Sequence, residues 1–176
     1  IAGQSTDSFE GKATRYESPA VASVALFGSG STGGNLRTQG GSVVSLQGTN
    51  FGPAGSNAAA VNASYGPSSD RRKYTIATSQ CTVQSHTEIR CTTGAGVGHG
   101  LAWLVTVDGQ HTETAVGSLR YESPTITGLS GDAAAEVGST TSGGTSITIS
   151  GTGFGPDNTS PVVVHYGPDS DPTRFQ

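Results

Sequence analysis

The two cysteines have the clearest capacity for chemistry. Cys81 and Cys91 bracket nine residues whose pattern predicts two short strands joined by a turn. Folding that segment in half would bring the two Cα atoms into the roughly 4.4–6.8 Å range that a disulfide needs. Two thiols alone cannot form a structural zinc site, which takes about four ligands. We therefore predict a Cys81–Cys91 disulfide formed in an oxidising compartment, rather than two reduced buried thiols in a cytosolic protein.

Two N-x-[ST] sequons offer a second kind of chemistry, the attachment of sugars to an asparagine side chain. They begin at Asn62 and Asn158. Alternating side chains predict that Asn62 points to solvent from a strand, and Asn158 follows Phe-Gly-Pro-Asp, which predicts a loop. We expect N-linked glycans at both asparagines if the chain is secreted, and the many Ser and Thr residues allow O-linked glycans as well. Sugars would add solubility to a chain in which only 12 % of the residues are charged.

No arrangement of residues predicts catalysis, a metal site or a bound cofactor. The four histidines are scattered, none has the spacing of a metal-binding pair, and no Gly-x-Ser-x-Gly motif accompanies them. Residues 28–33 fit the Gly-x-Gly-x-x-Gly pattern of dinucleotide sites, but the segment after them cannot begin the helix that such a site needs. We expect a non-enzymatic protein in which residues 28–33 form a loop. The histidines expected at the surface are His86, His99, His111 and His165.

Charge and hydropathy argue against two classes of partner. The chain of 176 residues has a net charge of −4 and one basic run, Arg71-Arg72-Lys73, whereas a nucleic-acid-binding surface needs clustered positive charge. We expect this run to form a solvated turn and no nucleic acid to bind. No apolar stretch approaches the ~18 residues of a membrane-spanning helix. Because the sequence contains no Met, we expect Ile1 to follow a processing site or an upstream part of a longer polypeptide.

Short motifs recur along the chain at a nearly constant distance. Arg-Tyr-Glu-Ser-Pro at residues 15–19 returns at residues 120–124, an offset of 105. Tyr-Gly-Pro at residues 65–67 returns at residues 166–168, an offset of 101. Self-similarity at a fixed period is the sequence signature of repeat proteins, and the small drift of the offset is expected where loops between strands shorten.

A longer segment between these motifs sets the period. The glycine-framed residues 40–53 return in similar form at residues 143–156, an offset of 103, which predicts a tandem repeat of about 103 residues. The two ends of the chain do not coincide with the boundaries of this repeat. We expect residues 1–15 to be the closing strand of a preceding unit, residues 16–120 one complete unit, and residues 121–176 the first half of the next unit.

Hydrophobic periodicity predicts strands. Apolar residues alternate with other residues over 101–107 and over 59–65, and the apolar spacing of a helix is nowhere sustained. The Gly-Gly pairs at 40–41 and 143–144 can adopt the positive φ of a tight turn into a strand, and Asp-Gly at 108–109 marks a hairpin. Short strands punctuated in this way predict an all-β, antiparallel sandwich.

The order of these motifs resembles a known family. Gly-Gly-x-x-Val-x-Leu-x-Gly-x-Asn-Phe-Gly-Pro at 40–53, Tyr-Gly-Pro at 65–67, the cysteine pair Cys81 and Cys91, and Val-x-Val-x-Gly-Gln at 105–110 are similar to an IPT/TIG domain. The resemblance implies an immunoglobulin-like β-sandwich. It also implies a place among cell-surface receptors, extracellular repeat proteins or some transcription factors. The tandem, Ser/Thr-rich form here is most similar to extracellular algal and protist repeat proteins of surface appendages.

These observations predict a structural protein, extracellular or at the cell surface. Its head-to-tail units would build a glycosylated fibre, stalk or appendage, with copies of itself or adjacent repeats as partners. Either the chain is one part of a longer polypeptide of continuous repeats, which we favour, or residues 3–16 of one subunit complete the last unit of the next by strand addition. The alternative function is an adhesion or receptor module that binds a protein or glycan. That module needs an exposed apolar patch, which is hard to build from one Trp, five Tyr and five Phe.

Overall fold

The protein folds almost entirely as antiparallel strands. The computed structural model describes residues 16–28, 34–55, 61–131, 141–157 and 162–176. Within these ranges the secondary structure consists of eleven strands and one 3-10 turn, Thr78–Gln80. No helix in the described part of the chain is long and apolar enough to cross a membrane. The predicted all-β class is confirmed.

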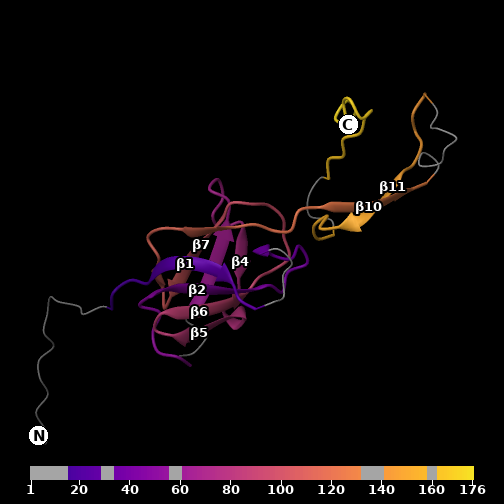
Figure 1. The fold of residues 1–176 in the computed structure, drawn as a ribbon. Helices are drawn as coiled ribbons and strands as arrows, with labels where there is room; N and C mark the ends of the chain where they lie inside the picture. The colour runs from indigo at the N-terminus through magenta and orange to yellow at the C-terminus, as the bar shows by residue number, and fades with distance from the viewer. Residues whose placement is uncertain (1–15, 29–33, 56–60, 132–140, 158–161) are drawn as a thin grey trace, which may run out of the picture.

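The described residues between 20 and 121 form a sandwich of two sheets, an immunoglobulin-like arrangement (Figure 1). One sheet has the antiparallel order β1-β2-β6-β5, and the other has the order β4-β3-β7-β8, with β9 also pairing with β7. The strands of the first sheet are β1 (Ala20–Leu26), β2 (Val43–Thr49), β5 (Cys81–Ser85) and β6 (Glu88–Thr92). Those of the second are β3 (Val61–Gly66), β4 (Tyr74–Ile76), β7 (Leu101–Val107), β8 (Gln110–His111) and β9 (Val116–Leu119).

The core lies between the two sheets because the strands alternate inward and outward side chains. In β7 the residues Leu101, Trp103 and Val105 are buried, as the alternation predicts, and in β3 the buried residues are Val61, Ala63 and Tyr65. Leu46 of β2 and Ile89 of β6 face them from the other sheet. Side chains that alternate across a strand in this way give each sheet one apolar and one polar face.

Two turns adopt the backbone conformations expected from their sequences. Asp108 and Gly109 have φ of 46° and 79° between β7 and β8, and two consecutive positive φ values suit a tight hairpin whose twist matches the strands. Gly40 and Gly41 have φ of 83° and 77° just before β2. Gly40 also packs so closely against the backbone of Gly94 that a Cβ atom would not fit there.

A second strand pair follows the sandwich. β10 (Thr125–Ser130) pairs with β11 (Thr148–Thr152), and Figure 1 shows this pair extending away from the sandwich. Its register matches that of β1 and β2 position by position. Ala20 opposes Thr49 and a bulge follows Val21 in the first pair, and Thr125 opposes Thr152 and a bulge follows Ile126 in the second.

Close packing also recurs between the two strand pairs. A Cβ atom on Gly48 would lie 2.6 Å from the ring of Phe51, and a Cβ atom on Gly151 would lie 2.6 Å from the ring of Phe154. Both glycines also press against a carbonyl of the first strand of their pair, so only glycine fits at either position.

Candidate functional site

Four aromatic side chains gather at the end of the sandwich from which β10 leaves. Three of them line a slot, and the ring of the fourth, Tyr121, fills it. Tyr65 stacks on Trp103 with ring centroids 4.3 Å apart, and Tyr74 lies 5.1 Å from Tyr65 on its other side. Tyr121, from the C-terminal end of the unit, meets the ring of Tyr74 edge to face at 5.6 Å. Offset and edge-to-face aromatic contacts of this kind contribute about 0.5–1.5 kcal/mol each beyond the burial of apolar area.

The phenol groups in the slot are hydrogen-bonded to one another and to one loop. The Tyr65 and Tyr121 hydroxyl oxygens lie 2.6 Å apart, and the Tyr121 hydroxyl donates to the Gly94 carbonyl at 3.0 Å. The Tyr74 hydroxyl donates to the Val97 carbonyl and accepts from the Val97 N–H. These bonds satisfy polar atoms that would otherwise be costly to bury.

Only glycine fits in the loop beneath these rings. A Cβ atom on Gly96 would lie 2.7 Å from the Tyr121 hydroxyl and 2.8 Å from the Tyr74 ring. The backbone of the loop therefore approaches the aromatic rings directly, which allows its carbonyl groups to receive the phenol hydrogens.

Burial raises the pKa of the two phenols that are bonded to each other, those of Tyr65 and Tyr121. Desolvation raises the pKa of Tyr121 far above its ordinary value, and the hydrogen bond to Tyr65 raises it further. Desolvation also raises the pKa of Tyr65, although its hydrogen bond with Tyr121 lowers it in part. The folded protein thus keeps both phenols neutral at a pH where an unfolded chain would ionise them.

We predict a loss of stability in alkaline solution as a result. A group whose folded pKa is raised contributes stability that is complete below the unfolded pKa, near 10, and that is lost as the pH rises above it. We expect the free energy of unfolding to fall by about 1.4 kcal/mol per buried tyrosine for each pH unit above 10, while the folded phenols stay protonated. Urea denaturation at pH 8, 10 and 11 measures this fall. The fall should be smaller in Tyr121→Phe, and equal stability at pH 8 and 11 would contradict the role of burial.

Backbone hydrogen bonds clamp the segment around Tyr121 onto the sandwich. Leu36 donates its N–H to the Arg120 carbonyl and accepts the N–H of Glu122, both at 2.8 Å, which makes a short parallel bridge. Tyr121 donates its N–H to the Gly98 carbonyl at 2.9 Å. Only Ser123 and Pro124 separate this clamp from the first residue of β10, so the connection has few free torsions.

A further contact joins the segment after β11 to the sandwich. The Gln39 side-chain N–H donates to the Gly155 carbonyl at 3.5 Å. Beside this contact lies a cleft of about 440 Å³. Its lining includes Val97, His99 and Glu122 from the sandwich and Phe154 and Val162 from the segment beyond.

The described residues between 125 and 176 present an apolar surface that is open to solvent. Phe154 is 41 % exposed and Tyr166 is 57 % exposed, whereas their sequence counterparts in the sandwich, Phe51 and Tyr65, are buried. An exposed apolar patch was expected to be hard to build from so few aromatic residues, and the exposed side chains here are mostly aliphatic. The large exposed apolar residues of this segment are Ile126, Leu129, Ile147, Phe154, Val162, Val163, Val164, Tyr166 and Phe175.

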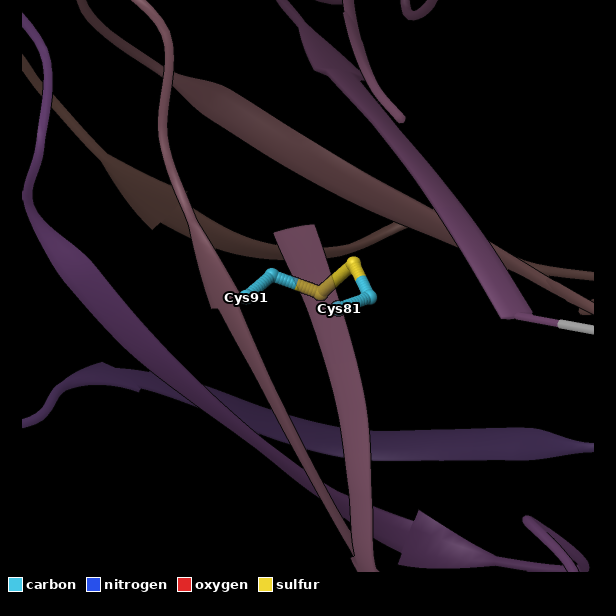
Figure 2. The surroundings of a disulfide bond; sticks show 2 residues. All are labelled: Cys81 and Cys91. Atoms are coloured by element: carbon cyan, nitrogen blue, oxygen red, sulfur yellow. A yellow bond between two sulfur atoms is a disulfide. The ribbon is translucent and has the colours of Figure 1, made fainter. Parts of the chain in front are cut away.

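The predicted disulfide is present between Cys81 and Cys91 (Figure 2). The two residues lie directly opposite one another on β5 and β6, and the turn between these strands contains His86 and Thr87. Their Cα atoms are 4.1 Å apart, just below the predicted range, because facing residues of antiparallel strands approach to about 4.5 Å. Both side chains are buried, so the bond links β5, the edge strand of its sheet, to β6 from within the core.

We predict that reduction of this disulfide lowers the free energy of unfolding by about 2–3 kcal/mol. The bond closes a loop of ten residues, and the lost restriction of the unfolded chain accounts for most of that effect. Denaturant titration of the oxidised and reduced protein measures the difference. Adding reductant to the variant with Cys81→Ala and Cys91→Ala should change nothing, and an unchanged midpoint in the native protein would contradict the prediction.

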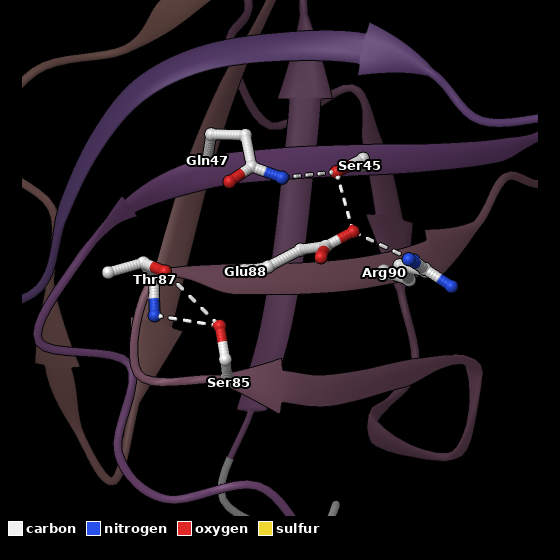
Figure 3. A network of polar contacts seen from close by, with 6 residues as sticks. All are labelled: Ser45, Gln47, Ser85, Thr87, Glu88 and Arg90. Atoms are coloured by element: carbon white, nitrogen blue, oxygen red, sulfur yellow. Dashed lines mark hydrogen bonds and ion pairs between the residues drawn. The ribbon is translucent and has the colours of Figure 1, made fainter.

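A polar network covers the outer face of the sheet that holds the disulfide (Figure 3). Ser45 and Arg90 both donate to one oxygen of Glu88, at 3.0 and 2.8 Å, and Gln47 donates to Ser45. The hydrogen bond from Arg90 lowers the pKa of the Glu88 carboxyl. The Arg90 guanidinium also lies 3.6 Å from the ring centroid of Phe27. The network joins β2, β6 and the end of β1.

The structure describes only part of the predicted glycan and loop positions. Asn62 is exposed on the outer face of β3, beside a shallow hollow whose lining includes Arg72 and His111. Asn158 and most of the loop 28–33 lie outside the described residues. The run Arg71-Arg72-Lys73 is exposed in a turn, as predicted.

The histidines are surface residues, as predicted. All four side chains are exposed, and among the residues described no group of three or more His, Cys, Asp or Glu side chains is arranged to hold a metal ion. Sequence reasoning missed the aromatic slot instead. Two of its tyrosines, Tyr65 and Tyr121, belong to motifs that recur in the chain, and this recurrence is the signal that would have identified them.

The slot and most of its clamp lie within a segment that matches a known family. Residues 35–121 match the model of the IPT/TIG domain, a non-catalytic immunoglobulin-like module. No curated protein matches the chain. The match confirms, for this segment, the family resemblance found in the sequence motifs. It also includes Tyr121, whose side chain belongs to the core of the sandwich although the sequence placed the end of that unit at residue 120.

Proposed function

Because residues 35–121 form an IPT/TIG domain, we propose that this chain belongs to a structural extracellular protein made of head-to-tail immunoglobulin-like units. In this proposal tandem units build a glycosylated fibre, stalk or surface appendage, and the chain has no enzymatic role. The observation that carries the proposal is the second strand pair. β10 and β11 repeat the register and the bulge of β1 and β2, directly after the clamp that ends the sandwich.

The short connection between the units supports a mechanical role. Backbone bonds hold the chain on the sandwich through Glu122, and β10 begins at Thr125. Pro124 restricts its own φ and the conformation of Ser123 before it. A joint with so few free torsions transmits the direction of one unit to the next, as a stiff fibre requires.

A disulfide and the exposed sequon at Asn62 support an extracellular location. The Cys81–Cys91 bond would persist in an oxidising compartment, and IPT/TIG domains occur in extracellular and surface proteins. A glycan on Asn62 would stand on the outer face of β3, away from the joint. Sugars on this face would shield the sheet from proteases and from strand edges of neighbouring molecules.

The glycan proposal has a direct test at Asn62. We predict that the peptide containing Asn62 carries an N-linked glycan in material from the natural source, so that enzymatic removal of N-glycans converts Asn62 to Asp. Mass spectrometry of the digested protein measures this change. Asn35 and Asn50 are not followed by a Ser or Thr two residues on and serve as internal controls. An unmodified Asn62 in all of the material would contradict the prediction.

The open half-unit can be completed in two ways in this proposal. Residues that follow in a longer polypeptide would supply the missing strands, or the N-terminal segment of a second subunit would be added as a strand. The intact mass after removal of sugars separates the two. A mass far above the 17.6 kDa of this chain supports a longer polypeptide, and a mass near that value supports strand addition between subunits.

The alternative is an adhesion or receptor module, and the cleft beside the joint favours it. This cleft of about 440 Å³ combines apolar Phe154 and Val162 with the polar side chains of His99 and Glu122, a mixture that suits a protein or glycan ligand. Imaging of the purified protein by electron microscopy decides between the two functions. Filaments with a regular axial repeat support the structural role, and dispersed single particles support the module.

A further inference from the structure

The hollow beside Asn62 lies on the outer face of the sheet that contains β3, β7 and β8. Its volume is about 210 Å³. In the register of the sheet, Asn62 lies opposite Thr106 of β7, and Thr106 lies opposite His111 of β8. Residues that oppose each other on antiparallel strands point to the same face of the sheet. These three residues therefore form one row of the lining, which crosses three strands.

A second row lies beside the first and completes the lining. Ser64 of β3 lies opposite Leu104 of β7 on one side and opposite Thr75 of β4 on the other. Leu104 is the apolar member of this row and is partly buried. Arg72, in the turn before β4, adds a guanidinium to the hollow. The lining thus combines an apolar side chain with hydroxyl groups, an imidazole and a guanidinium.

Several polar side chains of this lining lack protein partners, unlike those on the outer face of the other sheet. The side chains drawn in Figure 3 are hydrogen-bonded among themselves. In the hollow, the side chains of Ser64, Thr75 and Arg72 make no hydrogen bond to any other residue that the structure describes. Their donor groups therefore face the hollow free to bond to a ligand.

The attachment point of a glycan is itself part of the lining. Asn62 is exposed, and its side chain contributes to the wall of the hollow. The first sugar of an N-linked glycan is joined to the side-chain nitrogen of the asparagine, so its ring stays beside that atom. A group held on so short a tether has an effective concentration of the order of millimolar, which is enough to fill even a weak subsite.

We propose that this hollow is the subsite in which the first sugar of the Asn62 glycan docks. The inference rests on the proposed function, because that function supplies the glycan at Asn62. An N-acetylated hexose presents C–H groups on the faces of its ring, and hydroxyl and acetamide groups around its edge. One face packs on Leu104. The hydroxyls of Ser64 and Thr75 and the guanidinium of Arg72 donate to the oxygens at the edge, and such a combination of apolar contact and a few placed donors is typical of ligand sites.

Docking predicts that the first sugar alone stabilises the sandwich. The contacts join β3, β4 and β7 and exist only in the folded state, so they favour folding. The test uses the chain secreted from a glycosylating host, with Asn158→Gln to remove the other sequon and an enzyme that cuts after the first sugar. We expect its unfolding equilibrium constant to be about 3- to 10-fold lower than that of the same chain made without glycans. Arg72→Ala should reduce this factor, and a double-mutant cycle isolates the loss.

A glycan moved to the other sheet is the matched control. Ser85→Asn creates an Asn-His-Thr sequon at the turn between β5 and β6, and Asn62→Gln removes the original one. A single sugar at residue 85 should change the unfolding equilibrium constant less than about 2-fold. Equal stabilisation by a sugar at either position would show an effect that needs no subsite, and would overturn the docking.

Nuclear magnetic resonance detects the contact itself. Cross-relaxation should appear between the ring protons of the first sugar and the methyl groups of Leu104. Its absence in a chain that carries the sugar at Asn62 overturns the docking and leaves the predicted glycosylation standing. An Asn62 that is unmodified both in the natural source and in the glycosylating host overturns the glycan and the docking together.

Discussion

Replacement of Tyr121 by alanine should destabilise the IPT/TIG unit by about 3–5 kcal/mol, the cost of removing a large buried aromatic side chain. The change empties the slot beside Tyr74 and removes the partner of the Tyr65 hydroxyl. It also leaves the Gly94 carbonyl without its hydrogen bond from the phenol. Chemical denaturation followed by the fluorescence of Trp103 measures the loss, because that residue lies against Tyr65 in the same stack.

Two further variants define what the Tyr121 side chain contributes. Tyr121→Phe keeps the ring and removes the hydroxyl, so we expect a smaller loss of about 1–3 kcal/mol from the polar groups left unpaired. Tyr16→Ala changes the same residue of the same motif where the ring is exposed, and we expect less than about 0.5 kcal/mol. Equal losses in Tyr121→Ala and Tyr16→Ala would contradict the account of the slot.

The second large effect should come from completing the open half-unit. Gln176 corresponds to Thr75 in the repeat, so grafting residues 76–121 after Gln176 supplies the missing counterparts of β5 to β9. We expect the graft to fold onto residues 125–176 and to add a second cooperative unfolding transition. The reason is that exposed side chains such as Phe154 and Val162 become buried, at about 1.5–3 kcal/mol each.

The binding of a dye that reports exposed apolar surface provides a second measurement of the graft. The dye should bind the native chain at residues 125–176 and should bind the grafted chain much less. A graft in which the added copy of Trp103 is replaced by aspartate, the Trp103→Asp change, is the matched control and should not fold. Unchanged dye binding and a single transition in the intact graft would contradict the assignment of this segment as half of a sandwich.

Local patterns predicted much of the sandwich. The alternation from Leu101 to Val107 identified the buried side of β7, because a strand with one face exposed to solvent can place its apolar side chains in the core in only one register. Asp108 and Gly109 identified the hairpin, because positive φ at both positions is tolerated by few residue types. The disulfide followed from ten residues of separation and a turn between the cysteines. Each of these features depends on neighbours in the sequence.

The aromatic slot could not be found in the same way. Tyr65 and Tyr121 are 56 residues apart, and their contact depends on how the two sheets pack rather than on either strand alone. Composition was misleading for a related reason. The aromatic residues were judged too few to form an exposed patch, whereas Tyr166 and Phe175 are exposed because, among the residues described, no strand pairs beside Tyr166 as β7 pairs beside Tyr65. Which face is covered is a property of the assembled fold.

Hydrogen exchange of the assembled and the dispersed protein tests the central claim most directly. That claim is that head-to-tail neighbours cover the open sheet of residues 125–176. We predict that assembly slows amide exchange in residues 162–176, toward the rates of their counterparts in residues 61–75 of the complete sandwich. Exchange in residues 162–176 that is as fast in the fibre as in the dispersed chain would contradict the account.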